Sequence, residues 1–192
     1  MKKSFNILGA ILTCTLLSSS LLAASDKFVA FPIFTDDTWK PNFEVAAVAG
    51  HVDFLPKGID SGTMYGMELS FDCPVFTLPG DNLLRQQLNL NQYDKNGLRV
   101  TTIEMNPYYF VDITEDLVFG FGPGIGGVHA DLDGGKDQWM LAAQVGAGVK
   151  YYIDGFIIGA DLRRQWTASK DFGNGNQDLD NMRFLLKAGY RF

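Results

Sequence analysis

Both histidines of the chain are followed, two residues later, by an aspartate: His51 precedes Asp53, and His129 precedes Asp131. A histidine beside an acid is the kind of base that activates a serine or cysteine nucleophile. Neither histidine has a serine beside it, so each pair lacks the group that would attack a substrate. We interpret both pairs as polar surface residues, and we expect no catalytic residue.

Aspartates and glycines in the polar segments raise the question of a bound metal ion. His129, Asp131 and Asp133 could supply three ligands, but one histidine in one loop is poor spacing for zinc. The polar segments contain no twelve-residue calcium loop. The glycine-rich segment 120–127 lacks the lysine and the serine or threonine of a phosphate-binding loop. We therefore expect no metal ion and no cofactor.

Charged residues also occur at alternate positions in several segments, where they share one face with glycine. The acids are Glu68, Asp72, Glu104, Asp112 and Asp161, and the bases are Lys150, Arg163, Arg183, Lys187 and Arg191. Unpaired charges in a closed interior cost several kcal/mol each. The near balance of acids and bases therefore predicts a salt-bridge network. It could gate a thin water path, or it could plug the interior and fix the strand register. We favour the plug.

These charges lie in segments whose side chains alternate strictly between two faces, which is the pattern of β-strands. Clear alternation covers 62–76, 102–113, 138–153, 156–166 and 182–192, and weaker alternation covers 43–55, 84–93 and 117–128. The sequence thus predicts eight strands of about 10–15 residues. Such strands are longer than those of most soluble sheets and long enough to cross a membrane in a tilted barrel.

The two faces of these strands differ in the way that a membrane barrel requires. One face is rich in Phe, Tyr, Leu and Val, whereas the other carries glycine and charge. A soluble barrel would place the apolar face inside, and a membrane barrel inverts that arrangement. An eight-stranded barrel is narrow, so small residues suit its interior. The candidates are the glycines at positions 120, 122, 124, 126, 146, 148, 159 and 189.

The connections predict which end of the barrel faces the outside. Short turns are expected at 113–116 and 154–155, and longer polar connections at 56–62, 93–97, 129–137 and 168–180. Counting strands from a periplasmic N-terminus places the longer connections outside the cell, as in outer-membrane barrels. The connection 74–84 is long for the periplasmic side. Aromatic girdles at the two membrane surfaces are expected from Tyr108, Tyr109, Phe110, Tyr151, Tyr152, Trp166, Tyr190 and Phe192.

The eight two-faced strands, the short inner turns and the final "GYRF" resemble the small eight-stranded outer-membrane β-barrel family, typified by outer membrane protein X and the barrel part of outer membrane protein A. The resemblance covers nearly the whole chain after the leader described below. It implies that the last strand is the signal read by the outer-membrane assembly machinery. The residues that would carry that signal are Phe192, Tyr190, Ala188 and Leu186.

The first residues have the layout of a secretory signal peptide, with two lysines, an apolar stretch and then small residues. We expect a signal peptide over 1–25, a periplasmic segment over 26–42 and the barrel over 43–192. Without the leader, 14 basic residues stand against 22 acidic ones, a net charge of −8 that argues against nucleic acid as a partner. Cys73 is then the only cysteine, so no intrachain disulfide can form.

We therefore predict an all-β, eight-stranded antiparallel transmembrane barrel in the outer membrane of a Gram-negative bacterium. The expected role is non-enzymatic: envelope structure and surface interaction through four outer loops whose ligand the sequence does not identify. The expected surroundings are outer-membrane lipid and lipopolysaccharide, and we expect a monomer. A narrow, porin-like pore for small solutes is the alternative. Modification of lipid A through His51 or His129 is a further alternative, and a soluble periplasmic barrel is another.

Overall fold

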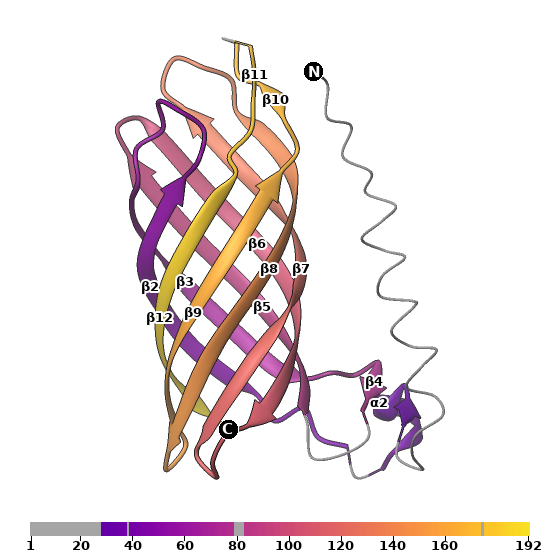
Figure 1. The fold of residues 1–192 in the computed structure, drawn as a ribbon. Helices are drawn as coiled ribbons and strands as arrows, with labels where there is room; N and C mark the ends of the chain where they lie inside the picture. Colours follow the sequence, from indigo (N-terminus) through magenta and orange to yellow (C-terminus); the bar gives the residue numbers. More distant parts are fainter. Residues whose placement is uncertain (1–27, 38, 79–82, 174) are drawn as a thin grey trace.

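The structure is a computed structural model that describes residues 28–37, 39–78, 83–173 and 175–192 (Figure 1). The signal peptide expected over 1–25 lies outside these residues. Within the described part of the chain, no helix is long and apolar enough to cross a lipid bilayer.

Eight long strands close into an antiparallel barrel in the order β12, β2, β3, β5, β6, β7, β8, β9 (Figure 1). The strands are β2 (Glu44–Phe54), β3 (Gly62–Asp72), β5 (Leu83–Lys95), β6 (Leu98–Asp112), β7 (Leu117–Leu132), β8 (Gln138–Ile153), β9 (Phe156–Thr167) and β12 (Asn181–Arg191). The first and last strands pair along their whole length, from Glu44 opposite Arg191 to Phe54 opposite Asn181. The predicted fold class and strand number are confirmed.

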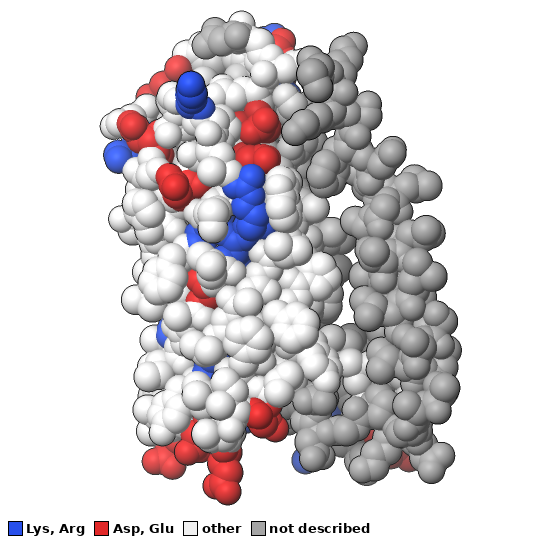
Figure 2. Space-filling model, in the orientation of Figure 1, with Lys and Arg blue, Asp and Glu red and all other residues white. Residues whose placement is uncertain are grey.

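The alternation of side chains explains why these segments form a membrane barrel. In β12, Arg183 and Lys187 are buried, whereas Phe184 and Leu186 between them are exposed on the outer face. The other long strands repeat this pattern, so large apolar side chains form an outward belt. Figure 2 shows acidic side chains at both ends of the barrel and a group of Lys and Arg side chains below the upper acids, whereas the lower half above the acids at the other end is mostly uncharged. A lipid-facing belt has this composition.

The two ends of the barrel differ. The turn end carries connections 113–116 and 154–155 together with Phe192, and the loop end carries connections 55–61, 96–97, 133–137 and 168–180. The connection expected over 93–97 is instead a two-residue turn, because Asn96 and Gly97 adopt positive φ angles of 50° and 78°. An Asn-Gly pair favours this tight hairpin turn. The connection 168–180 contains a small hairpin of β10 (Lys170–Asp171) and β11 (Asn176–Gln177).

A small lobe lies beside the turn end of the barrel (Figure 1). It contains β1 (Val29–Ala30), the one-turn helix α2 (Pro32–Thr35) and β4 (Phe76–Thr77). The strands β1 and β4 pair in antiparallel fashion. The connection between β3 and β5 is long for this end of the barrel because part of it forms a sheet with the residues that precede the barrel.

Three of the aromatic residues expected in the membrane girdles face the interior instead. Tyr108 and Phe110 are buried there and cluster with Val118, and the half-buried Tyr152 packs against the cluster. Tyr108 and Phe110 alternate with the outward Tyr109, so strand periodicity assigns them to the inner face. The prediction for these side chains rested on residue type and was wrong.

Candidate functional site

The centre of the barrel interior is organised around Arg163 of β9. Its guanidinium lies 2.6 Å from Asp161, 3.3 Å from Glu68 of β3 and 3.4 Å from Glu104 of β6. These four side chains are each at most 3% exposed. A planar cation with several donors can satisfy carboxylates from different directions. Arg163 thereby connects three strands across the lumen.

The last strand adds two more cations to this cluster. Lys187 Nζ lies 2.8 Å from both Glu68 Oε2 and Asp161 Oδ2, and Arg183 Nη1 lies 2.7 Å from Glu104 Oε1. Gln165 Nε2 also donates to Glu104 at 2.8 Å. Opposite charges at these distances offset the cost of burying each other. The interior of β12 is therefore fixed by ionic contacts to β3, β6 and β9.

A second cluster, nearer the turn end, surrounds Glu44. Its carboxylate lies 2.8 Å from Lys150, 2.8 Å from Arg191 and 3.4 Å from Arg85. Arg85 also pairs with Asp72 at 2.6 Å. Lys150 lies 3.3 Å from Glu68 and so joins this cluster to the central one. We call the two clusters together the lumenal network.

The structure buries seven of the ten charged residues predicted to face the interior. They are Glu68, Glu104, Lys150, Asp161, Arg163, Arg183 and Lys187. Asp72 and Arg191 lie at the turn end and pair with Arg85 and Glu44. Asp112 is exposed and forms no salt bridge among the described residues. It occupies the last position of β6, where the strand reaches the mouth, so its placement in the interior was wrong.

Sequence reasoning missed Glu44 and Arg85. A usable signal existed for Arg85, because it alternates with Gln87, Asn89 and Asn91, which are all buried polar residues on the inner face of β5. Glu44 gives no comparable signal. It is the first residue of its strand, and the next inward positions of β2, Ala46 and Val48, are apolar.

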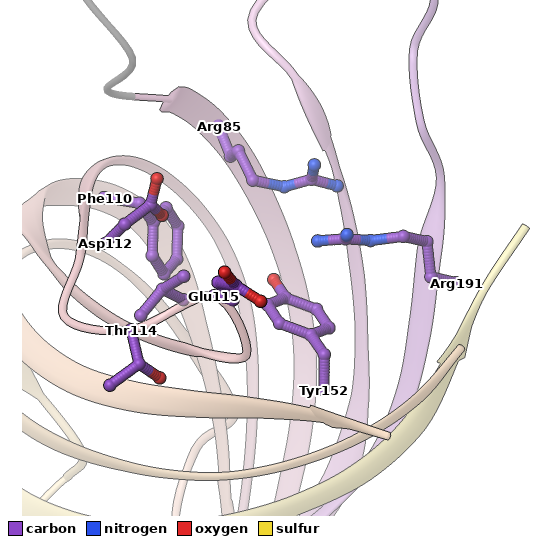
Figure 3. Close-up of a pocket in the computed structure, with 8 residues that line it drawn as sticks. Arg85, Phe110, Asp112, Thr114, Glu115, Tyr152 and Arg191 are labelled. Carbon is purple, nitrogen blue, oxygen red and sulfur yellow. The ribbon is translucent and has the colours of Figure 1, made fainter. Parts of the chain in front are cut away.

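A cavity of about 300 Å³ lies in the mouth at the turn end (Figure 3). Its lining residues are Arg85, Phe110, Asp112, Thr114, Glu115, Val118, Tyr152 and Arg191. Arg85 and Arg191 extend toward each other from opposite sides, and Tyr152 lies below them with Glu115 beside it. The Tyr152 hydroxyl donates to Glu44 at 3.1 Å. The lumenal network thus forms the inner boundary of this cavity.

The loop end of the lumen is filled by apolar side chains. The cluster consists of Val52, Phe54, Met64, Tyr93, Leu98, Val100, Val128, Ala130, Met140, Ala142, Phe172 and Leu179, all buried. Phe172 and Leu179 come from the connection 168–180 and are buried in one cluster with side chains of the barrel strands. We call this cluster the apolar plug.

The connections above the plug are joined to one another by hydrogen bonds. The Tyr93 hydroxyl donates to Asp60 O at 2.5 Å, and Lys95 Nζ donates to Ser61 O at 2.7 Å. Asp133 N donates to Gly97 O at 2.8 Å. Lys136 N donates to Phe172 O at 3.2 Å, and Gln138 Nε2 donates to Asp171 O at 3.0 Å. These two bonds link the connection 133–137 and the start of β8 to the connection 168–180. The four connections form one braced surface, which we call the loop platform.

The carboxyl pKa values of two aspartates in the platform, Asp171 and Asp180, are shifted in opposite directions. Backbone N–H groups of Gly173 and Gly175 donate to Asp171 at 2.9 and 3.3 Å and lower the pKa of its carboxyl. Burial raises the pKa of Asp180 above its usual value, and the nearby Asp178 charge acts in the same direction. The N–H of Thr167, which donates to Asp180 at 2.8 Å, opposes this rise.

Neither histidine is held as a catalytic base. His51 lies on the exposed outer face of β2, and the His129 ring lies 5.0 Å from the Trp139 ring. The Ser61 hydroxyl donates to Asp53, which the sequence did not suggest. In the part of the chain that is described, no hydrogen bond joins His51 to Ser61 or Asp53. The arrangement therefore lacks the serine-to-histidine contact of a catalytic triad.

The residues proposed as an assembly signal lie on one side of β12. Leu186, Ala188, Tyr190 and Phe192 are all exposed on the outer face. The Tyr190 ring lies 5.4 Å from that of Phe192 and 5.3 Å from that of Phe156. Phe192 N donates to Phe43 O at 2.9 Å and ties the last residue to the residue just before β2.

Comparisons with known proteins agree on the fold. No protein-family model matches the sequence, and no curated protein is significantly similar to it. Among solved structures, the attachment invasion locus protein Ail of Yersinia pestis is 15% identical, with a TM-score of 0.51 over 80% of this chain and 100% of that one. Neisserial surface protein A is 19% identical, with a TM-score of 0.53 over 78% of this chain and 95% of that one. With its outward apolar belt, the chain is therefore a small eight-stranded β-barrel of the outer-membrane type.

Proposed function

We propose that the chain is a non-enzymatic outer-membrane protein that acts at the cell surface through its loop platform. The observation that carries this proposal is the bracing of four separate connections by hydrogen bonds above the apolar plug. Binding loops are most effective when a rigid scaffold positions them. Here the barrel is the scaffold, and the platform is the surface it presents.

The filled lumen supports this role over that of a pore. The lumenal network occupies the middle of the barrel with paired, buried charges, and the apolar plug fills the loop end. Eight strands leave an interior just wide enough for side chains. The network therefore stabilises a closed barrel, and its ionic contacts fix the strand register.

Two similar structures add support by analogy. The name of the Yersinia pestis protein refers to attachment and invasion, and the Neisserial protein is named for the surface. At 15% and 19% identity these likenesses concern the fold, so the surface role remains our inference. We further propose that the barrel is monomeric, that lipopolysaccharide surrounds the platform, and that the assembly machinery reads β12 during insertion.

Cysteine labelling of intact cells tests the orientation and the exposure of the platform. In a Cys73→Ser background, Lys57→Cys and Lys136→Cys should react with a membrane-impermeant maleimide before lysis. Glu115→Cys, in connection 113–116, should react only after the outer membrane is opened. Labelling of Glu115→Cys in intact cells, with the other two protected, would overturn the proposal.

Conductance and lipid analysis test the two alternatives. A folded, inserted sample should give no discrete current steps in a planar bilayer, after a heat-shift gel has established folding. Reproducible steps would mean that the lumenal charges line a water path. Expression of the chain should leave the mass spectrum of lipid A unchanged. A new lipid A species that disappears with His51→Ala or Ser61→Ala would favour an enzyme.

A further inference from the structure

The lobe beside the turn end exposes a set of apolar side chains that the barrel does not cover. We define the lobe as residues 28–37, 39–42 and 73–78. On α2 and the residue before it, Phe31 is 53% exposed, Ile33 46% and Phe34 83%. Adjacent apolar side chains left in water are unfavourable, and such patches mark interaction surfaces. Pro32, between them, is buried and anchors the turn.

The lobe is attached firmly to the barrel at several points. Cys73 N of the lobe donates to Leu84 O of β5 at 2.9 Å. At the barrel edge, Asp72 N donates to Pro41 O at 2.8 Å, and Arg85 of the lumenal network donates to Asn42 O at 2.6 Å. These bonds hold the lobe beside the barrel.

The apolar surface of the lobe continues the lipid-facing belt. The exposed Phe43 lies 5.8 Å, ring to ring, from Phe71 on the outer face of β3. The chain then leads from Phe71 to the exposed Val75 and Phe76 of the lobe. Figure 1 shows the lobe to the side of the barrel, at the level of its turn end. A membrane surface around the barrel would lie at this level.

The remaining side chains of the lobe suit the boundary between lipid and water. Asp37 and Lys40 are exposed, and Trp39 is half-buried between them. Tryptophan and lysine beside an apolar surface are the residues that anchor proteins at a bilayer interface. The lobe therefore has an apolar side for acyl chains and a polar side for head groups and water.

We propose that the lobe is an interfacial anchor that inserts Phe31, Ile33 and Phe34 into the phospholipid leaflet at the turn end. The proposal rests on the barrel spanning a membrane, and it is independent of the role of the loop platform. The lobe widens the footprint of the protein in one leaflet only. It would thereby resist tilting of the barrel in the membrane.

Nitroxide labels test this placement in the full chain carrying Cys14→Ser and Cys73→Ser. The protein is refolded into vesicles of phosphatidylethanolamine and phosphatidylglycerol, with labels at Phe34→Cys or Ile33→Cys. Labels in lipid collide with oxygen more than with a water-soluble nickel complex. We expect both labels to show this preference, as a label at the belt position Phe156→Cys should. A label at Asp37→Cys should show the opposite preference.

The controls separate failure of the proposal from failure of the barrel. If the label at position 156 is in lipid while those at 33 and 34 are in water, the barrel is inserted and the anchor proposal is wrong. If the labels at 33 and 34 are shielded from both reagents, a protein surface covers the lobe, which also overturns the proposal. Two labelled positions guard against one substitution disturbing α2.

Discussion

Lys187 on the last strand of the barrel and Glu68 on the second are 119 residues apart in sequence, yet Nζ and Oε2 lie 2.8 Å apart in the lumen. Lys187 contacts Asp161 at the same distance. Replacing it with methionine would leave two carboxylates short of a cation inside the barrel. Breaking a buried ion pair from one side costs about 3–5 kcal/mol, so Lys187→Met should lower the unfolding free energy by about that amount.

Urea unfolding in lipid vesicles, followed by tryptophan fluorescence and the heat-shift gel, measures this loss. Lys57→Met is the matched control, because Lys57 is exposed in a connection at the loop end. It should change the unfolding midpoint little. Equal midpoints for the two variants would show that the lumenal network does not hold β12 in place.

Gly50 of β2 allows the first and last strands to approach closely. A Cβ atom built there would lie 2.0 Å from Phe184 O, which is backbone and cannot move aside alone. Overpacking of this kind costs about 1–3 kcal/mol, so Gly50→Ala should lower the free energy of unfolding by about that amount or more. Gly127→Ala is the control, because its Cβ would meet only the Trp139 side chain at 3.3 Å. Similar unfolding midpoints for the two variants would contradict the register of β2 and β12.

Removal of Phe192 tests the proposed assembly signal. We expect the amount of folded barrel in the outer membrane to fall severalfold and unfolded chain to accumulate, because the assembly machinery no longer meets a terminal aromatic residue. Phe156→Ala is a close control, since Phe156 and Phe192 contact the same Tyr190 ring at 5.3 and 5.4 Å. Equal losses in the two variants, measured by cell fractionation and heat-shift gels, would indicate lost ring packing instead.

Two aspartates of the platform should titrate on opposite sides of about 3.9, the ordinary pKa of aspartate: Asp171 below it and Asp180 above it. The N–H groups of Gly173 and Gly175 favour ionised Asp171 and lower its pKa, so its contribution to stability is present above the ordinary value and is lost as pH falls. Burial raises the pKa of Asp180, so its ionisation weakens the folded state, and stability is regained as pH falls through that pKa. Carboxyl NMR shifts across an acid titration of the micelle-bound protein measure both midpoints. Coinciding midpoints would contradict these contacts.

Strand alternation allowed the barrel to be predicted because it is a local property of the sequence. It identified every long strand, and the inward phase of β12 predicted that Arg183 and Lys187 would be buried. The missed acid, Glu44, stands at the first position of β2, and the next inward residues, Ala46 and Val48, are apolar and give no sign of a charged interior. Its role depends on Lys150, 106 residues away, and local spacing carries no such information.

The apolar plug and the lobe were also beyond local reasoning. Phe172 and Leu179 lie in a polar, glycine-rich connection, where an isolated apolar residue gives no periodic signal. Their burial depends on the strand ends that meet beneath them after the barrel closes. The pairing of β1 with β4 likewise joins two short segments, neither of which has the length of a recognisable strand.

The lumenal charges are divided unevenly along the chain. In the first four barrel strands the network contains Glu44, Glu68, Asp72 and Glu104 against Arg85, whereas in the last four it contains Lys150, Arg163, Arg183, Lys187 and Arg191 against Asp161. A break in the connection 113–116 would therefore yield two half-sheets of opposite inner charge. Each would attract its complement and repel a copy of itself. The two halves should thus reassemble into a whole barrel after cleavage, with electrostatics selecting the correct partner half.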